Sequence, residues 1–175
     1  MIVLNVGGGS RHLPPEYEGW DGHLLDINPD CQPDLCMDGK DLITYDAMQF
    51  DAVLCSHNLE HYYRHDVAQV LAGFLHVLKD GGHADIRVPN IMGLFSAMAR
   101  GQLDIDDVWY RAGGSPVTFH DVMYGWNTAM ENGNLFYAHK CGFSPLSLAA
   151  AMQKAGFKDV QIKADELNIQ AIGKK

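Results

Sequence analysis

The sequence predicts an α/β fold, a Rossmann-like doubly wound and mostly parallel sheet that ends in an antiparallel hairpin. Three observations lead to this prediction. Short apolar runs end in glycine or in an acid, a helical period separates two of these runs, and two further runs near the C-terminus are joined by only a short turn.

The predicted parallel strands are short, and most are almost entirely apolar. Runs of this kind are typical of strands that are buried on both faces of a parallel sheet. We expect them at residues 2–6, 22–27, 33–38, 50–56 and 83–89, the last after a turn signal, KDGG, at 79–82.

Helices are predicted in two places. Between the fourth and fifth strands, apolar residues from Val67 to Leu78 recur at helical spacing, and Gly81 follows as a stop signal. Strand, helix and strand in this order form a βαβ unit. The second helix has Ser144 as N-cap and ends near Gly156, and two strands at 157–163 and 167–174 then form the hairpin.

The length of 175 residues predicts a single domain, 1–175. Residues 90–143 differ from the rest because they are rich in Gly, Trp, Tyr, Phe and His and lack a clean period. We interpret this segment as an insertion with one or two short helices.

The net charge of −9 argues against a partner such as a long nucleic acid, which binds through phosphate neutralisation. The first residues carry no basic region and no long apolar segment, so neither a signal peptide nor a membrane partner is expected. The four cysteines form no C-x-x-C pair. A cytoplasmic location is the resulting expectation.

Ligands of open α/β sheets bind at the carboxyl ends of the strands. In this sequence, glycines or acidic residues stand at the carboxyl ends of three predicted strands. Gly7, Gly8 and Gly9 follow the first strand and let a ligand approach the backbone. Asp26 ends the second strand, about 20 residues later, where an acid can grip ribose hydroxyls, and Asp38 ends the third. Together they favour a cofactor that contains a nucleoside.

The sequence of the glycine loop helps to distinguish between two kinds of nucleoside cofactor, a dinucleotide and a cofactor without phosphate. A dinucleotide needs G-x-G-x-x-G and a helix N-terminus for its pyrophosphate. Here a third glycine is missing, and Pro14 and Pro15 shorten any helix that follows. A dinucleotide oxidoreductase is therefore the less favoured hypothesis. S-adenosylmethionine (SAM) has no phosphate, so it needs less from such a helix.

The sequence resembles the class I SAM-dependent methyltransferases, of the type 11-like group. The resemblance covers most of residues 1–90 and 139–172. It rests on VLNVGGGS, LLDINPD, DLCMDG, FDAVLCSHNLEHY, the helix before LKDGG and the C-terminal AGFKDVQI hairpin.

This resemblance implies roles for individual residues. The glycine loop would approach the methionine part of SAM, the acid after strand two the ribose, and the acid after strand three the adenine, while residues after strand four would line the methyl-transfer site. The implied cofactor-binding residues are Asn5, Gly7, Gly8, Gly9, Asp26, Ile27, Asp38, Gly39, Ser56, His57 and Asn58.

Two residues depart from the family pattern. Asn5 stands where the family often has an acid, and Arg11 replaces the last glycine, which suggests a shortened first helix. These departures keep open an alternative, a catalytically inactive subunit with a SAM-binding fold.

The stretch SHNLEHY contains H-x-x-E-H, a spacing also found in zinc peptidases. A peptidase needs this motif inside a helix, whereas His57 here follows a strand directly. Some methyltransferases carry E-x-x-E-H at this place and bind a divalent ion. This chain keeps Glu60 and His61 only, so the metal question stays open, and we favour Glu60 as a brace at the start of the next helix.

The expected reaction is methyl transfer to oxygen or nitrogen of a small-molecule acceptor, which requires removal of a proton. Imidazoles suit that step, and His57, His61 and His139 are the candidate catalytic residues, with His120 less favoured.

The insertion, residues 90–143, would cap the acceptor side. Its aromatic residues would form an apolar wall or a satellite core: Trp109, Tyr110, Tyr124, Trp126, Phe136 and Tyr137. The sequence leaves the oligomeric state open.

Overall fold

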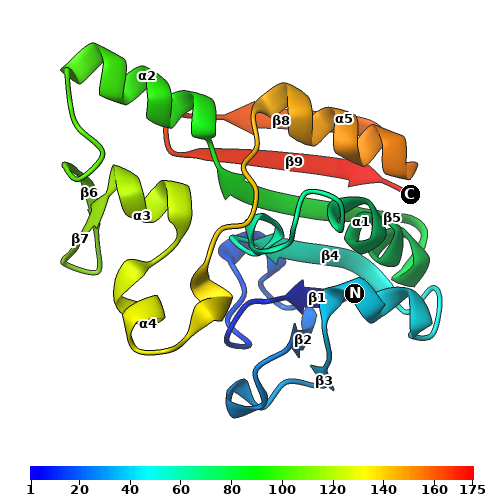
Figure 1. The fold of residues 1–175 in the computed structure, drawn as a ribbon. Helices are drawn as coiled ribbons and strands as arrows, with labels where there is room; N and C mark the ends of the chain where they lie inside the picture. Colours follow the sequence, from blue (N-terminus) through cyan, green and yellow to red (C-terminus); the bar gives the residue numbers. More distant parts are fainter.

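A computed structural model describes residues 1–175. Seven strands form one sheet in the order β3-β2-β1-β4-β5-β9-β8 (Figure 1). The strands are β1 (Ile2–Val6), β2 (Asp21–Asp26), β3 (Leu35–Cys36), β4 (Phe50–Ser56), β5 (Leu78–Pro89), β8 (Lys158–Ala164) and β9 (Asn168–Lys174). The strands from β3 to β5 are parallel, and β9 runs antiparallel to both β5 and β8. The predicted fold class is confirmed.

Two strands differ from their predicted limits. β3 has only two residues, fewer than the run 33–38 suggested. β5 begins at Leu78, directly after the preceding helix, so the turn predicted at 79–82 lies inside the strand. The pairing of β4 with β5 shifts register between Phe50 and Ala52, and Gly81 has a φ of 78°. The glycines therefore form an irregular strand start and not a separate turn.

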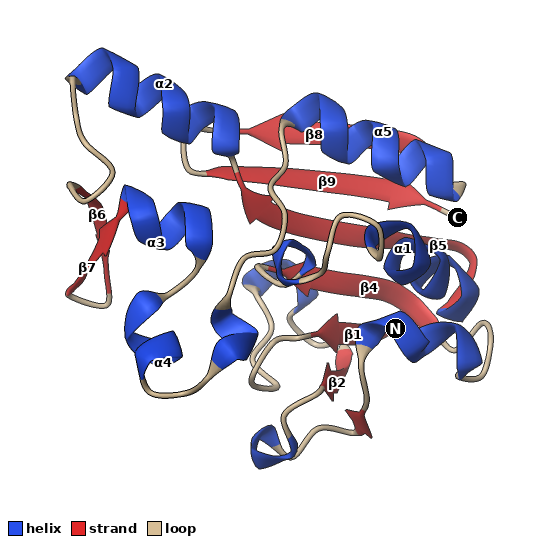
Figure 2. Cartoon of the chain, viewed as in Figure 1, coloured by secondary structure: helices blue, strands red, loops and turns tan.

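One face of the sheet is covered by α1 (Val67–Val77) and α5 (Pro145–Ala155) (Figure 2). The apolar stripe predicted for the first of these helices is the buried one, and it packs against the 3-10 helix η3 (Gly39–Thr44). Ser144 caps α5 in a reciprocal capping box with Ser147. No helix of the chain has the length and apolar character needed to cross a membrane.

The opposite face is covered by the connection between β1 and β2, which contains no α-helix. A single 3-10 turn, η1 (Pro15–Tyr17), carries the buried Tyr17 onto Val3, Ala52 and Leu54. The first helix is thus reduced to one turn, as the two prolines and Arg11 suggested.

The segment 90–143 holds more regular structure than the one or two helices expected. It contains α2 (Ile91–Gly101), a hairpin of β6 (Val108–Ala112) and β7 (Ser115–Thr118), α3 (Phe119–Tyr124), α4 (Asn127–Glu131) and the 3-10 turn η5 (Leu135–Tyr137). Two of these helices have only five or six residues, which is too short for a helical period to be visible in the sequence.

Figure 1 shows this insertion beside the carboxyl ends of β1, β4 and β5. It has a small hydrophobic cluster of its own, formed by Leu94, Ala97, Phe119 and Val122. The side-chain amide of Asn90 ties the start of α2 to the β8–β9 turn by donating to the Asp165 carbonyl at 2.7 Å.

Candidate active site

A cavity of about 260 Å³ lies at the carboxyl ends of β1, β2 and β4. Most of the residues predicted to bind a cofactor line it, although they come from four separate segments of the chain. Those residues are Gly7, Gly9, Asp26, Ile27, Asp38, Gly39, His57 and Asn58, and the candidate catalytic residue His61 lines the cavity as well. The glycine loop and the acid after β2 therefore face the same space.

Two requirements explain the glycines of this loop: a left-handed backbone at Gly7 and Gly9, and close packing that leaves no room for a Cβ at Gly7 and Gly8. Gly7 and Gly9 have φ values of 67° and 61°, in the left-handed region. A Cβ on Gly7 would lie 2.0 Å from the Asn58 side chain, and one on Gly8 would lie 2.2 Å from that of Asn5. The loop after β1 thus packs directly on the loop after β4.

Asp26 joins this loop to the end of β2. Its carboxylate accepts the Gly9 N–H at 3.0 Å and the Asn28 N–H at 2.9 Å. The residue is 9% exposed and lines the cavity. Each carboxylate oxygen can accept a second hydrogen bond, so Asp26 can hold the loop and still bind a hydroxyl group.

Asp38 and Gly39 form the next part of the wall. Asp38 caps η3 by accepting the Lys40 N–H at 2.9 Å, so the turn role considered from the sequence is realised. A Cβ on Gly39 would lie 2.5 Å from the hydroxyl oxygen of Tyr62. Burial raises the pKa of Tyr62, which therefore stays a neutral phenol beside the cavity.

Four predicted site residues lie outside the cavity lining: Asn5, Gly8, Ser56 and His139. Asn5 is buried and donates its side-chain amide to the Ser10 carbonyl at 3.1 Å, which braces the glycine loop from beneath. Ser56 lines a separate hollow on the other side of His57, together with Arg87 and Gln170.

His57 occupies a left-handed conformation, with a φ of 51°, immediately after β4. Residues other than glycine in this conformation are uncommon and are enriched at active sites. The imidazole is about half exposed, and its Nδ1 lies 3.5 Å from Oε1 of Glu60, an ion-pair distance too long for a good hydrogen bond. The Glu60 carboxylate raises the pKa of His57.

Glu60 corrects the interpretation of SHNLEHY. It does not brace a helix start, because it lies in the isolated 3-10 turn η4 (Leu59–His61), and α1 begins only at Val67. Glu60 is 1% exposed, and neither carboxylate oxygen has a hydrogen-bond partner. The peptidase hypothesis also finds no support, since the motif follows the end of a strand, continues into a 3-10 turn and does not lie inside an α-helix.

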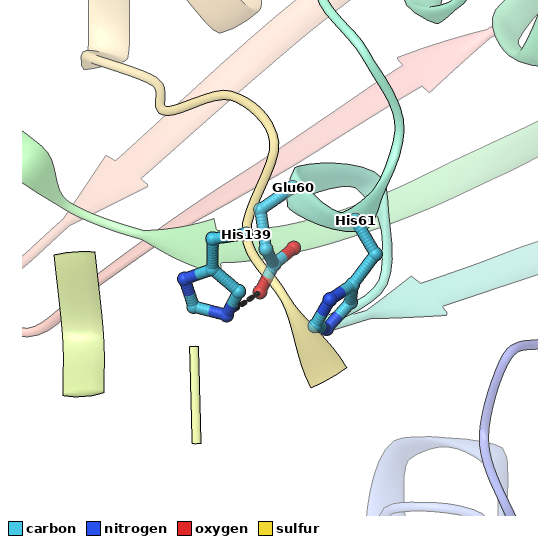
Figure 3. A group of neighbouring side chains, drawn as sticks. All are labelled: Glu60, His61 and His139. Atoms are coloured by element: carbon cyan, nitrogen blue, oxygen red, sulfur yellow. Dashed lines mark ion pairs between the residues drawn. The ribbon is translucent and has the colours of Figure 1, made fainter. Parts of the chain in front are cut away.

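His61 and His139 flank this carboxylate, and Figure 3 shows the three side chains turned toward one another. Nδ1 of His61 lies 3.0 Å from the Ala138 carbonyl oxygen, and Nδ1 of His139 lies 2.9 Å from the Val122 carbonyl oxygen. Nε2 of His139 lies 4.0 Å from Oε1 of Glu60. Burial lowers the pKa of His139, which favours its neutral form.

Several residues of the cavity wall were not predicted from the sequence, notably Tyr62, Asn134 and Lys140. Tyr62 immediately follows the H-x-x-E-H spacing and could have been included with it. Asn134 and Lys140 gave no signal, because only the folding of the insertion carries them to the cavity.

The aromatic residues of the insertion divide into three groups. Phe136 and Tyr137 line the cavity. Trp109 and Tyr110 pack on the satellite cluster, whereas Tyr124 and Trp126 are half exposed. Two of the six residues therefore lie at the cavity and two in the satellite core, as that part of the prediction required.

Comparison with known proteins identifies the family. Residues 1–162 match the family model described as a methyltransferase domain. The chain belongs to this family, and its fold is that of the class I SAM-dependent methyltransferases. No curated protein matches the sequence.

Solved structures share the fold at low identity. A SAM-dependent methyltransferase from Archaeoglobus fulgidus is 17% identical with a TM-score of 0.65, and the match covers 99% of this chain and 86% of that one. The 1,6-didemethyltoxoflavin-N1-methyltransferase of Burkholderia thailandensis, solved with bound 1,6-didemethyltoxoflavin and S-adenosylhomocysteine, is 16% identical with a TM-score of 0.60, and the match covers 99% of this chain and 70% of that one. Human N-acetylserotonin methyltransferase in complex with SAM is 16% identical with a TM-score of 0.59, over 99% of this chain and 47% of that one.

The residues of the cavity fit SAM. A buried acid at the end of β2 suits ribose hydroxyls, and Gly7 and Gly9 leave backbone accessible. The Asn58 side-chain oxygen is buried without a hydrogen-bond partner, although it belongs to a residue of the cavity wall, and an ammonium group is the kind of donor it lacks.

Proposed function

We propose that this chain transfers a methyl group from SAM to an oxygen or nitrogen atom of a small-molecule acceptor. The observation that carries the proposal is the single cavity shared by Asp26, the glycine loop, and His57 and Asn58 after β4. Residues suited to a nucleoside and residues suited to proton transfer lie along one continuous wall.

The cofactor roles follow from position in the cavity. Asp26 would accept hydrogen bonds from the ribose, Ile27 and Asp38 would flank the adenine, and Gly7 and Gly9 would leave room for the methionine part. SAM supplies a methyl group already activated by its sulfonium. The main task of the protein is therefore to position the acceptor, and in-line positioning can lower the barrier by several kcal/mol.

Of the three candidate histidines, we propose His57 as the group that accepts the acceptor's proton. It lines the cavity, follows β4 and is about half exposed, so an acceptor atom can reach it. His139 does not line the cavity. His61 lines it, but its Nδ1 lies at hydrogen-bonding distance from a backbone carbonyl.

We further propose that residues 90–143 are an acceptor-side cap within one domain, 1–175. Phe136, Tyr137 and Asn134 support this role because they bring apolar surface and one amide to the cavity. The mixture suits a planar, moderately polar acceptor better than a charged polymer.

We also propose a cytoplasmic location, which is supported by the four cysteines, all of them free.

One observation favours the alternative of an inactive SAM-binding subunit. Asn5 is uncharged and donates its amide to the Ser10 carbonyl, so it offers the cofactor no negative charge at the glycine loop. Turnover separates the two hypotheses, since an inactive subunit would bind SAM and methylate nothing.

The test is S-adenosylhomocysteine formation with a panel of hydroxyl-bearing and amine-bearing small molecules. We expect turnover with at least one of these acceptors, and His57→Gln should lower kcat by roughly 100-fold, the range for loss of a general base, with little change in SAM affinity. His65→Gln, which alters a largely exposed histidine of the next loop, is the matched control. SAM binding without turnover on any acceptor would instead support the inactive subunit.

A further inference from the structure

We propose that Glu60, His61 and His139 form a binding site for a divalent transition-metal ion. Each residue offers one ligand atom, and the three atoms lie within 4.8 Å of one another. The inference goes beyond the proposed function, because it requires neither SAM nor methyl transfer.

The first argument is the state of Glu60. Its side chain is 2% exposed, and both carboxylate oxygens lack a hydrogen-bond partner. A buried carboxylate without partners is costly, so such groups are normally paired or bound to a metal. The nearest basic groups, on His57 and His139, lie 3.5 and 4.0 Å from Oε1. Neither distance gives a good hydrogen bond, whereas a cation placed among these groups would neutralise the carboxylate.

The second argument is the orientation of the two imidazoles. Nδ1 of His61 faces the Ala138 carbonyl, and Nδ1 of His139 faces the Val122 carbonyl. A carbonyl only accepts, so each Nδ1 carries a proton, and in the neutral ring Nε2 is then the nitrogen that has a free lone pair. This arrangement, with Nδ1–H donating to a backbone carbonyl, is the one that metal-binding histidines commonly adopt.

The third argument is geometric. Ligand atoms in a tetrahedral site with bonds near 2.0–2.1 Å lie about 3.3 Å apart. The three atoms here lie up to 4.8 Å apart, so they would have to approach by up to about 1.5 Å, which side-chain rotations can provide. The rings of His61 and His139 are already 4.8 Å apart between centroids.

The ligand set indicates the class of metal. Two imidazole nitrogens and one carboxylate oxygen suit Zn²⁺, Fe²⁺, Co²⁺ or Ni²⁺ better than Mg²⁺ or Ca²⁺, which prefer oxygen ligands. Three protein ligands leave at least one coordination position open. Since His61 also lines the cavity, the ion would lie at the cavity wall.

The site would also connect two parts of the chain. Glu60 and His61 belong to the turn after β4, whereas His139 belongs to the insertion, and the Glu60 carbonyl already accepts the Lys140 N–H at 2.8 Å. An ion held between them would fasten the insertion to the sheet.

The test uses the full chain without a histidine tag, stripped of metal and titrated with Co²⁺ while the visible absorption of the bound ion is followed. We expect one Co²⁺ per chain, displaced by Zn²⁺. His139→Asn and Glu60→Gln should each raise the Kd at least tenfold. His120→Gln, a histidine of the same insertion outside the cluster, should leave the Kd unchanged.

A measurement on the unmodified protein guards against variants that fail to fold. On addition of Zn²⁺, the imidazole nitrogen NMR resonances of His61 and His139 should shift, and that of His120 should not. Absence of one-to-one Co²⁺ binding, equal Kd values for the wild type and both variants, or unmoved His61 and His139 resonances would each overturn the proposal. SAM affinity, measured separately without metal, reports on the proposed function alone.

Discussion

At the scale of single residues, acids in this chain connect segments that are distant in sequence. Asp26 holds the glycine loop, and Asp51 accepts the Ile2 N–H at 2.7 Å and pairs with Lys79 at 3.0 Å. Asp51 thereby ties the starts of β1, β4 and β5 together at the edge opposite the cavity. Those contacts lower the pKa of Asp51, with the Ile2 N–H as the largest cause and Lys79 as the second.

The lowered pKa gives a pH-dependent prediction. A carboxyl group whose pKa is lower in the folded state stabilises the fold above its unfolded pKa, near 3.9, and loses this contribution as the pH falls through the folded value. Asp51→Asn should therefore reduce the free energy of unfolding by about 1 kcal/mol at pH 7, because one charged hydrogen bond and one solvent-screened ion pair are weakened.

Urea denaturation at pH 7 and pH 3 measures this effect. The difference between wild type and variant should shrink at pH 3, because this pH lies below the unfolded pKa and the contribution of Asp51 is lost as the pH falls toward the folded value. Asp80→Asn, which alters an exposed acid on the neighbouring strand β5, is the control. A difference equal at both pH values would show that the Asp51 charge does not stabilise the fold.

Residue positions at strand ends could be predicted because they follow from sheet geometry. Asp26, Asp38 and Gly7 each follow a strand that the apolar pattern revealed, and parallel strands bring their carboxyl ends to one edge. Glu60 could not be placed in this way. Its burial depends on the turn after β4 and on the insertion that covers it, and neither has a sequence period.

At the scale of elements, α5 is the helix whose ends the sequence marks most clearly. Ser144 accepts the Ser147 N–H at 3.1 Å, Pro145 occupies the first turn, and Gly156 ends the helix with a φ of 113°. Its buried residues Leu148 and Met152 pack into the main core. Local capping and tertiary packing therefore specify the same boundaries.

Ser144→Ala should reduce the free energy of unfolding by about 1 kcal/mol, the typical cost of losing an N-cap. Chemical denaturation followed by circular dichroism measures the change. Ser96→Ala is the matched control, because Ser96 lies inside α2, is exposed and only donates back to the Met92 carbonyl. Equal losses for both variants would contradict a specific capping role for Ser144.

The helices and strands of the insertion could not be predicted from the sequence. Its hairpin β6–β7 and its short helices α3 and α4 are too brief for a period to reveal. They are held by the cluster around Phe119, which forms only when residues far apart in the segment meet. Composition alone indicated an unusual segment, and folding was needed to show that it faces the cavity.

At the scale of the whole molecule, the strand order β3-β2-β1-β4-β5-β9-β8 explains the position of the cavity. The chain runs outward from β1 to β3 and then returns to β4 on the other side of β1. Neighbouring loops therefore diverge at the β1–β4 boundary, where open α/β sheets bind their ligands. The glycine loop and the turn at His57 meet at this boundary.

This topology was predictable because each part had a separate signal: apolar strands, one helical stripe and a C-terminal hairpin. The single face covered by α1 and α5 is less usual, and it follows from the prolines that reduce the first connection to one 3-10 turn. The sequence indicated this reduction, but only the structure showed that Tyr17 covers the face instead.

A calorimetric titration with SAM tests the central claim most directly, since all roles proposed for the cavity depend on SAM binding beside Asp26. We predict one SAM per chain for the wild type, and for Asp26→Asn a loss of about 2 kcal/mol of binding free energy, or roughly 30-fold in Kd, because the ribose hydroxyls lose a charged acceptor. Asp30→Asn, which alters an exposed acid of the same loop outside the cavity lining, should bind SAM as the wild type does. Failure of the wild type to bind SAM, or unchanged affinity in Asp26→Asn, would contradict the proposed site.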